Sequence, residues 1–167
     1  TLGEKHPAEC AALRASIAWE SGVSVHEMDG YHALRAHLPP RERRALVLVD
    51  APFEAQGEFE RIARALSEGL QRFSSGTYAV WYPLTERAQV DEFFVSLRAL
   101  GLPRTLVAEL TVAGRQSPLK MKGCGLVVIN PPWQFDQGAT PVLDWLADIL
   151  AQAPGGSGRV EWLVPGR

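Results

Sequence analysis

Two apolar runs in the sequence end on loops whose residue types suit the chemistry of an amine. The run at 46–49 is followed by Asp50, Ala51, Pro52 and Phe53, and the run at 126–129 by Asn130, Pro131, Pro132 and Trp133. Each loop joins an acid or amide to proline and an aromatic ring. Such a loop can hold the exocyclic amine of a nucleobase and stack on its ring. At most one of the two is expected to be catalytic.

The chemistry follows from the weakness of that amine as a nucleophile, because its lone pair is delocalised into the ring. The Asp50 carboxylate and the Ala51 carbonyl, by accepting its two N–H groups, would draw the lone pair toward a methyl sulfonium. Pro52 stiffens the loop, so that carbonyl and ring stay aimed. Phe53 would stack on a flipped base. Ala51 offers a carbonyl but lacks the stiffening of a first proline.

The elements that must position these loops alternate between strands and helices. Apolar runs predict the strands, and apolar stripes at helical spacing predict the helices. The predicted strands are 24–29, 44–50, 77–83, 105–112, 125–130 and 159–164, and the predicted helices are 8–19, 58–73, 87–100 and 141–151. Residues 1–7 resemble the end of one further strand. The run at 44–50 is typical of a strand buried on both faces.

The order of these elements predicts one α/β domain over residues 1–167, arranged as a three-layer sandwich. Strand–helix alternation in the first hundred residues predicts right-handed βαβ units and a mostly parallel sheet. After residue 104 strands outnumber helices, which predicts an antiparallel pair at the sheet edge. Because the sequence starts at Thr1 within a strand, we expect it to be the C-terminal portion of a longer protein.

Three acids follow successive strands, namely Glu4, Asp29 and Asp50. Ligands of open parallel sheets bind at the carboxyl ends of the strands. The order is typical of a nucleoside site, in which one acid binds the ribose, the next an adenine amine, and the third faces the substrate. For Asp29, which precedes Gly30, a plain helix cap is an equal alternative. His6 is a further candidate at the site edge, with a structural role as the stronger alternative.

Composition excludes several classes of function. The chain has 46% apolar and 22% charged residues and a net charge of −2, which does not favour binding to nucleic acid by bulk attraction. No apolar stretch reaches the roughly 20 residues of a membrane helix. The histidines and the two cysteines lack metal-ligand spacing. There are two basic clusters, Arg41–Arg44 and a looser one of Arg115, Lys120 and Lys122. A solvated loop is the favoured interpretation of both, and a local patch that binds RNA is the alternative.

In order and spacing, several motifs resemble those of the bacterial RlmJ family. They are "EKHP" (4–7), "DGY" (29–31), "LVLVDAPFE" (46–54), "GTYAVWYP" (76–83), "GCGLVVINPPW" (123–133) and "WLVP" (162–165). The resemblance implies a Rossmann-like class I methyltransferase fold. It also implies N6-methylation of an adenine in 23S ribosomal RNA, with S-adenosylmethionine as the cofactor. It places Glu4 at the cofactor ribose, Asp29 and Gly30 at its adenine, and residues 50–53 at the family's catalytic Asp-Pro-Pro-Tyr loop.

The sequence departs from the family pattern in two ways. Ala51 and Phe53 replace the first proline and the tyrosine, and the family's N-terminal segment with its Gly-rich cofactor loop is not in this sequence. We therefore expect the chain to hold the adenosine end of the cofactor without the methionine end, and to be inactive by itself. The alternatives are a non-catalytic or degenerate module that binds RNA or protein, and a methyltransferase that acts on DNA or protein.

The later Asn-Pro-Pro-Trp loop, which the family also carries, is interpreted as a rigid strand exit. Packing of Trp133 is favoured over a place on the substrate side, since Trp is mostly a core residue. The expected setting is the cytoplasm, with no metal and no membrane. The oligomeric state stays open, with a monomer as the expectation.

Overall fold

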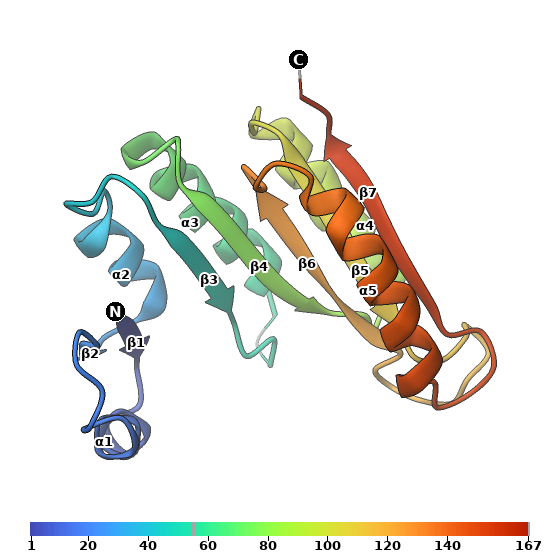
Figure 1. The fold of residues 1–167 in the computed structure, drawn as a ribbon, viewed down its shortest axis with the longest axis horizontal. Helices are drawn as coiled ribbons and strands as arrows, with labels where there is room; N and C mark the ends of the chain where they lie inside the picture. Colours follow the sequence, from blue (N-terminus) through green and yellow to red (C-terminus); the bar gives the residue numbers. More distant parts are fainter. Residues whose placement is uncertain (55, 167) are drawn as a thin grey trace.

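The computed structural model describes residues 1–54 and 56–166, which form two β-sheets and five helices (Figure 1). The strands are β1 (Leu2–Glu4), β2 (Val25–Glu27), β3 (Leu46–Asp50), β4 (Thr77–Pro83), β5 (Thr105–Thr111), β6 (Gly123–Ile129) and β7 (Ser157–Val164). The helices are α1 (Pro7–Ser16), α2 (Gly30–His37), α3 (Glu58–Arg72), α4 (Arg87–Ala99) and α5 (Phe135–Leu150). The α/β class and the strand order along the chain are confirmed.

The predicted balance between parallel and antiparallel pairing is wrong for the larger sheet. Its order is β3-β4-β6-β5-β7, in which β3–β4 is parallel and the other three pairings are antiparallel. The reason is that β6 follows β5 without a crossover helix and inserts between β4 and β5. By direction, β3, β4 and β5 still run the same way. Among the described residues, β1 and β2 pair with each other in parallel and form a separate two-stranded sheet.

These directions give the larger sheet two chemically different edges. β3 and β4 end at Asp50 and Pro83, and we call this side the Asp50 edge. Because β6 runs the other way, it ends beside the start of β4, where Tyr78 pairs with Ile129. We call that opposite side the Asn130 edge. The two candidate loops therefore leave the sheet at opposite edges.

The main core lies between the sheet and the helices α3 and α4. Both helices present apolar stripes to the sheet, as their 3.6-residue periodicity predicted. The fully buried side chains on this face include Ile62, Leu66, Val90, Phe93, Leu97, Tyr78, Val80 and Tyr82. Burial of each large side chain contributes roughly 1.5–3 kcal/mol to folding. This core fixes the first turns of α3 and α4 against the sheet, beside the Asp50 edge.

The opposite face of the sheet is covered only in part by α5. The helix lies against β7, where a Cβ on Gly158 would come within 2.8 Å of the Cβ of Leu143. At the other end of the sheet, Leu46 and Leu48 point to this same face and are 70% and 66% exposed. The prediction that the run at 44–50 is buried on both faces is therefore wrong for the described chain. Val47 and Val49 pack on the α3 side.

Two helices differ from the sequence-based expectation. The eight-residue helix α2 was not predicted, because a stripe of two turns is too short to stand out by periodicity. Helix α5 begins at Phe135, six residues before the predicted start, and contains Pro141. A proline normally marks the first turn of a helix, which explains why the predicted start fell on residue 141.

Candidate functional site

The loop after β3 exposes its acid and holds its aromatic ring in place. Asp50 is exposed at the end of the strand, and Ala51 is buried. Phe53 has a φ of 51°, a left-handed conformation that is uncommon for a bulky residue. Its ring contacts Phe59 and Trp81, with ring centroids 5.0 and 5.9 Å apart. Such strain concentrates at functional sites, and here two aromatic neighbours hold the strained residue.

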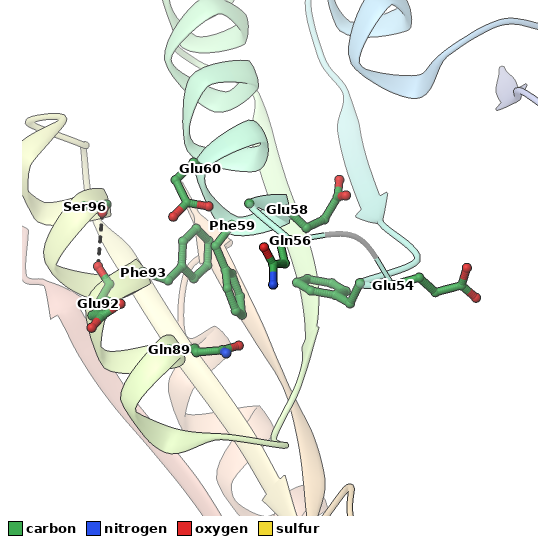
Figure 2. Close-up of a pocket in the computed structure, with 11 residues that line it drawn as sticks. Glu54, Gln56, Glu58, Phe59, Glu60, Gln89, Glu92, Phe93 and Ser96 are labelled. Carbon is green, nitrogen blue, oxygen red and sulfur yellow. Dashed lines mark hydrogen bonds between the residues drawn. The ribbon is translucent and has the colours of Figure 1, made fainter.

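A pocket of about 410 Å³ opens beside this loop (Figure 2). Its walls come from the loop, the first turn of α3 and the outer side of α4, and Figure 2 shows Phe59 and Phe93 facing each other across the two helices. Their ring centroids are 4.7 Å apart. Gln56, Gln89 and Glu58 supply polar groups. The size is within the usual range for small-ligand pockets, and the aromatic walls suit a flat ring.

A cluster of polar side chains joins the start of α2 to the start of α3. The Tyr31 hydroxyl donates to Glu58, and Arg61 donates to the same carboxylate at 3.1 and 3.4 Å. Arg61 also lies 3.7 Å from Asp29 and over the ring of Tyr31. Burial, with the Glu58 carboxylate beside it, raises the pKa of Tyr31 well above its usual value. Tyr31 therefore stays a hydroxyl donor at neutral pH.

Sequence reasoning missed this cluster. Tyr31 was noted only within the "DGY" motif, and Glu58 and Arg61 only as members of a helix. A signal was present, because Glu58 and Arg61 are three residues apart on a predicted helix and therefore share a face. Nothing in the sequence showed that the face meets Asp29, since α2 itself was not predicted.

The cofactor candidates lie at the ends of β1 and β2. The Glu4 carboxylate accepts the backbone N–H of His6 at 2.7 Å, and the Glu4 carbonyl accepts that of Met28 at 2.9 Å, next to Asp29. The exposed His6 contributes its backbone to this turn and is the N-cap of α1. This geometry agrees with the structural alternative for His6.

Asp29 is a helix cap, as the simpler interpretation proposed. Its Oδ1 accepts the backbone N–H of Tyr31 at 2.9 Å, at the start of α2. A Cβ added to Gly30 would meet nothing within 4 Å, so the space beside the backbone here is open. An acid with room next to its backbone fits the adenosine end of a nucleoside cofactor, because a ring can approach the chain closely there.

Most of these residues are connected by a series of contacts. The Glu4 carbonyl bonds beside Asp29, Asp29 contacts Arg61, and Arg61 bonds to Glu58, which lines the pocket with Phe53. Thus the ends of β1 and β2 are linked through the first turn of α3 to the pocket that Phe53 lines, and Asp50 lies three residues before Phe53 in the same loop. The predicted assembly of acids at strand ends is consistent with this geometry, and their roles toward a ligand stay a proposal.

The Asn130 loop has a different use. Its side-chain amide donates to the carbonyls of Ser74 and Gly76, both at 2.8 Å, and its carbonyl accepts the Thr77 hydroxyl at 2.9 Å. It has a φ of 51°, which asparagine tolerates better than most residues. Asn130 thus connects the end of β6 to the turn before β4, which agrees with the interpretation of this loop as a rigid strand exit. Trp133 is 82% exposed, so the expectation that it packs is wrong.

A buried ionic network holds α4 on the sheet. Glu109, on β5, accepts the Tyr82 hydroxyl at 2.8 Å and two bonds from Arg87 at 2.7 and 2.9 Å. A second arginine, Arg159, lies 3.5 Å from the same carboxylate. Every partner of this buried acid is a donor, so its charge is compensated. The network is structural, and it fixes the start of α4 at the Asp50 edge.

Within 1–54 and 56–166, no group of three or more His, Cys, Asp or Glu residues is arranged to hold a metal ion. In the same residues, no helix combines the length and apolar character needed to cross a membrane.

Together, the fold and the site define a class: an α/β protein with acids at the ends of parallel strands and an acid–aromatic loop beside a ring-sized pocket. A family model described as "Ribosomal RNA large subunit methyltransferase D, RlmJ" matches residues 1–164. The chain belongs to this family, and the resemblance of its motifs is thereby confirmed.

Relatives and a solved structure agree with the family. The chain is 38% identical over 164 residues to the ribosomal RNA large subunit methyltransferase J of Haemophilus influenzae, and 37% identical to that of Escherichia coli. A crystal structure of a Legionella pneumophila protein is similar with a TM-score of 0.86 and 32% identity over 96% of this chain. The chain spans 58% and 59% of the two methyltransferases and 59% of the Legionella chain.

Proposed function

We propose that the whole protein carrying this chain transfers a methyl group from S-adenosylmethionine to N6 of an adenine in 23S ribosomal RNA. The observation that supports this most is the loop of residues 50–53, which presents an exposed carboxylate and a fixed aromatic ring beside a pocket. Membership of a methyltransferase family and the names of the two relatives support the reaction class.

In this proposal the residues before Asp50 bind the cofactor, which when bound supplies an electrophilic methyl group. Glu4 accepts hydrogen bonds from the ribose hydroxyls with the carboxylate oxygen that does not face His6. Asp29 and the open space beside Gly30 receive the adenine ring. Arg61 holds Asp29 in place by a direct contact, and the buried Glu58 carboxylate in turn fixes Arg61.

The loop then orients the amine of the target base. Asp50 and the Ala51 carbonyl accept its two N–H groups, which localises the nitrogen lone pair on the side that faces away from both acceptors. Phe53 stacks on the base, and its left-handed backbone keeps the ring at a fixed angle. Because Phe lacks a hydroxyl, recognition here depends on the face of the ring and not on a hydrogen bond from Phe53.

The pocket beside Phe53 receives the flipped base in this proposal. Its aromatic side chains offer stacking surface, and the amides of Gln56 and Gln89 can read a base edge. Carboxylates of Glu54, Glu60 and Glu92 also line it. These charges repel phosphate, so the base can enter the pocket while the RNA backbone stays outside.

The test is identification of the product on protein-free large-subunit ribosomal RNA. The whole protein is incubated with labelled S-adenosylmethionine, and the RNA is digested to nucleosides and separated by chromatography. We expect the label in N6-methyladenosine. Label in another nucleoside would contradict the N6 assignment. Binding of this RNA without any labelled product would instead support the non-catalytic module.

A further inference from the structure

The loop between β5 and β6, residues 112–122, contains three cations and no acid. Its sequence "VAGRQSPLKMK" carries Arg115, Lys120 and Lys122, on a chain whose net charge is −2. Arg115 and Lys120 are exposed. None of the three is within 4.0 Å of an acid in an ion pair among the described residues. The positive charge of this loop is therefore available to a ligand.

The topology places this loop at the Asp50 edge. β6 begins at Gly123, where β5 and β4 both end. Two backbone bonds close this corner: Leu84 N–H donates to the Gly123 carbonyl at 2.9 Å, and Lys122 N–H donates to the Leu84 carbonyl at 3.0 Å. Asp50 pairs with Trp81 on β4, which in turn pairs with Leu126 on β6. Gly123 is thus two strands across the sheet from Asp50 and three residues farther along the strand direction. These two steps combine to a separation of roughly 14 Å. Figure 1 shows the loop on the side where β3 ends.

The loop is also held in one shape by backbone hydrogen bonds. The ladder continues one pair beyond the strands, from Val112 N–H to the Lys122 carbonyl at 2.8 Å. Gly114 donates to the Pro154 carbonyl at 3.0 Å, where a Cβ on Gly114 would come within 2.9 Å of that oxygen. Ala113 between them is buried. The cations thus project from an anchored loop and lose little backbone freedom when they bind.

The second basic cluster is on the other side of the sheet. Arg41, Arg43 and Arg44 precede β3 at its amino end, which is the Asn130 edge, and Glu42 lies among them. The two clusters have the same number of cations but opposite positions relative to Asp50. Of these two clusters, the 112–122 loop is the one on the same edge as the pocket beside Phe53, where it can contact a polymer whose base occupies that pocket.

We propose that the 112–122 loop binds the phosphate backbone of the RNA that flanks the target nucleotide, with Arg115 and Lys120 as the contacts. This inference rests on the proposed function for the identity of the polymer. It also fits the charge of the pocket, since the base enters between carboxylates while the phosphates of flanking nucleotides meet cations farther along the same edge of the sheet. Phosphate contacts of this kind position a nucleic acid and weaken with salt.

The experiment compares two matched double variants of the whole protein on protein-free large-subunit ribosomal RNA. The first is Arg115→Gln with Lys120→Gln, and the control is Arg41→Gln with Arg44→Gln, which removes the same charge at the opposite edge. RNA affinity is measured by filter binding from 50 to 300 mM salt, and methyl transfer gives KM and kcat. Cofactor binding and the thermal midpoint verify that both variants fold.

We expect the loop variant to reduce the slope of log affinity against log salt by about 0.7 to 1 for each cation removed. Its KM for RNA should rise while kcat and cofactor affinity stay unchanged, and the control should match the unmodified protein. Equal slopes for the two variants, or an effect on the control alone, would overturn the inference. Salt-dependent RNA binding without methyl transfer would contradict the proposed function and leave this inference standing.

Discussion

At the scale of single residues, the site depends on side chains whose neighbours are fixed before any ligand arrives. Phe53 keeps a left-handed backbone between two aromatic rings, and Glu58 is buried between the donors Tyr31 and Arg61. A buried carboxylate with two donors is stable only while both donors are present. We therefore regard Glu58 as a positioning residue for Asp29 and not as a catalytic residue.

Replacement of Glu58 by alanine tests this role. Removing the carboxylate leaves the Tyr31 hydroxyl without its acceptor, so we expect Glu58→Ala to lower the free energy of unfolding by about 1–3 kcal/mol in a urea titration. Glu60→Ala is the matched control, since Glu60 is exposed on the same turn of α3. Cofactor affinity of the whole protein should fall only for Glu58→Ala. A similar result for both variants would contradict the positioning role.

Tyr78 gives a pH-dependent test at the same scale. Its hydroxyl donates to the Phe73 carbonyl at 2.9 Å, and burial raises the pKa of Tyr78 to about 12. An unfolded tyrosine loses its proton near pH 10, so the folded state holds the proton more tightly between pH 10 and 12. Stability is therefore complete below pH 10 and falls as the pH rises through this range.

The measurement is the unfolding free energy between pH 7 and 11.5, for the natural chain and for Tyr78→Phe. The variant removes the titrating hydroxyl and keeps the ring, so its stability should fall less steeply above pH 10. Below pH 9 the two curves should run parallel, which serves as the internal control. Equal slopes above pH 10 would show that the Tyr78 proton is not linked to folding.

At the scale of elements, periodicity predicted what is local and failed where tertiary pairing decides. Helices α3 and α4 were predicted because each buries one long stripe, and β4 and β5 because each is a continuous apolar run. The run "LVLV" before Asp50 looked the same as those strands, yet Leu46 and Leu48 are exposed because no strand or helix of the described chain covers them. The sequence pattern shows which apolar side chains would be stabilised by burial, but it does not show whether a strand or helix covers them.

The candidate site was predicted in part for the same reason. Asp50 and Phe53 follow a continuous apolar run that clearly predicts a strand, so their position after the end of a strand could be predicted from the sequence. The contacts of Asp29 with Arg61 cross from one helix start to another, and such contacts leave no periodic trace in the sequence. The order of the acids along the chain also predicted that the Asn130 loop is a rigid strand exit, and the hydrogen bonds of Asn130 to Ser74 and Gly76 agree with this. The packing of Trp133 was predicted wrongly, because the general preference of Trp for the core does not show what covers one position.

At the scale of the whole molecule, the direction of strands decides which motif can act. β3 and β4 end at the Asp50 edge, whereas the antiparallel β6 carries Asn130 to the other edge. The pocket, the Tyr31–Glu58–Arg61 cluster and the 112–122 loop all lie on the Asp50 side. Within the described chain, the ladders of β1 and β3 each have a strand on one side only. This chain matches 58% and 59% of the length of its two curated relatives, and the activity proposed here belongs to the whole protein.

The most direct measurement of the central claim compares Asp50→Ala with Asn130→Ala in the whole protein, by methyl transfer to protein-free large-subunit ribosomal RNA. If Asp50 accepts the amine, its loss should lower kcat by about 10²–10³-fold, the usual effect of removing one aimed polar group. Asn130→Ala should lower the unfolding midpoint, because two backbone carbonyls lose their donor, and should leave kcat of the folded protein within a few-fold. Abolished transfer in Asn130→Ala together with full activity in Asp50→Ala would contradict the assignment.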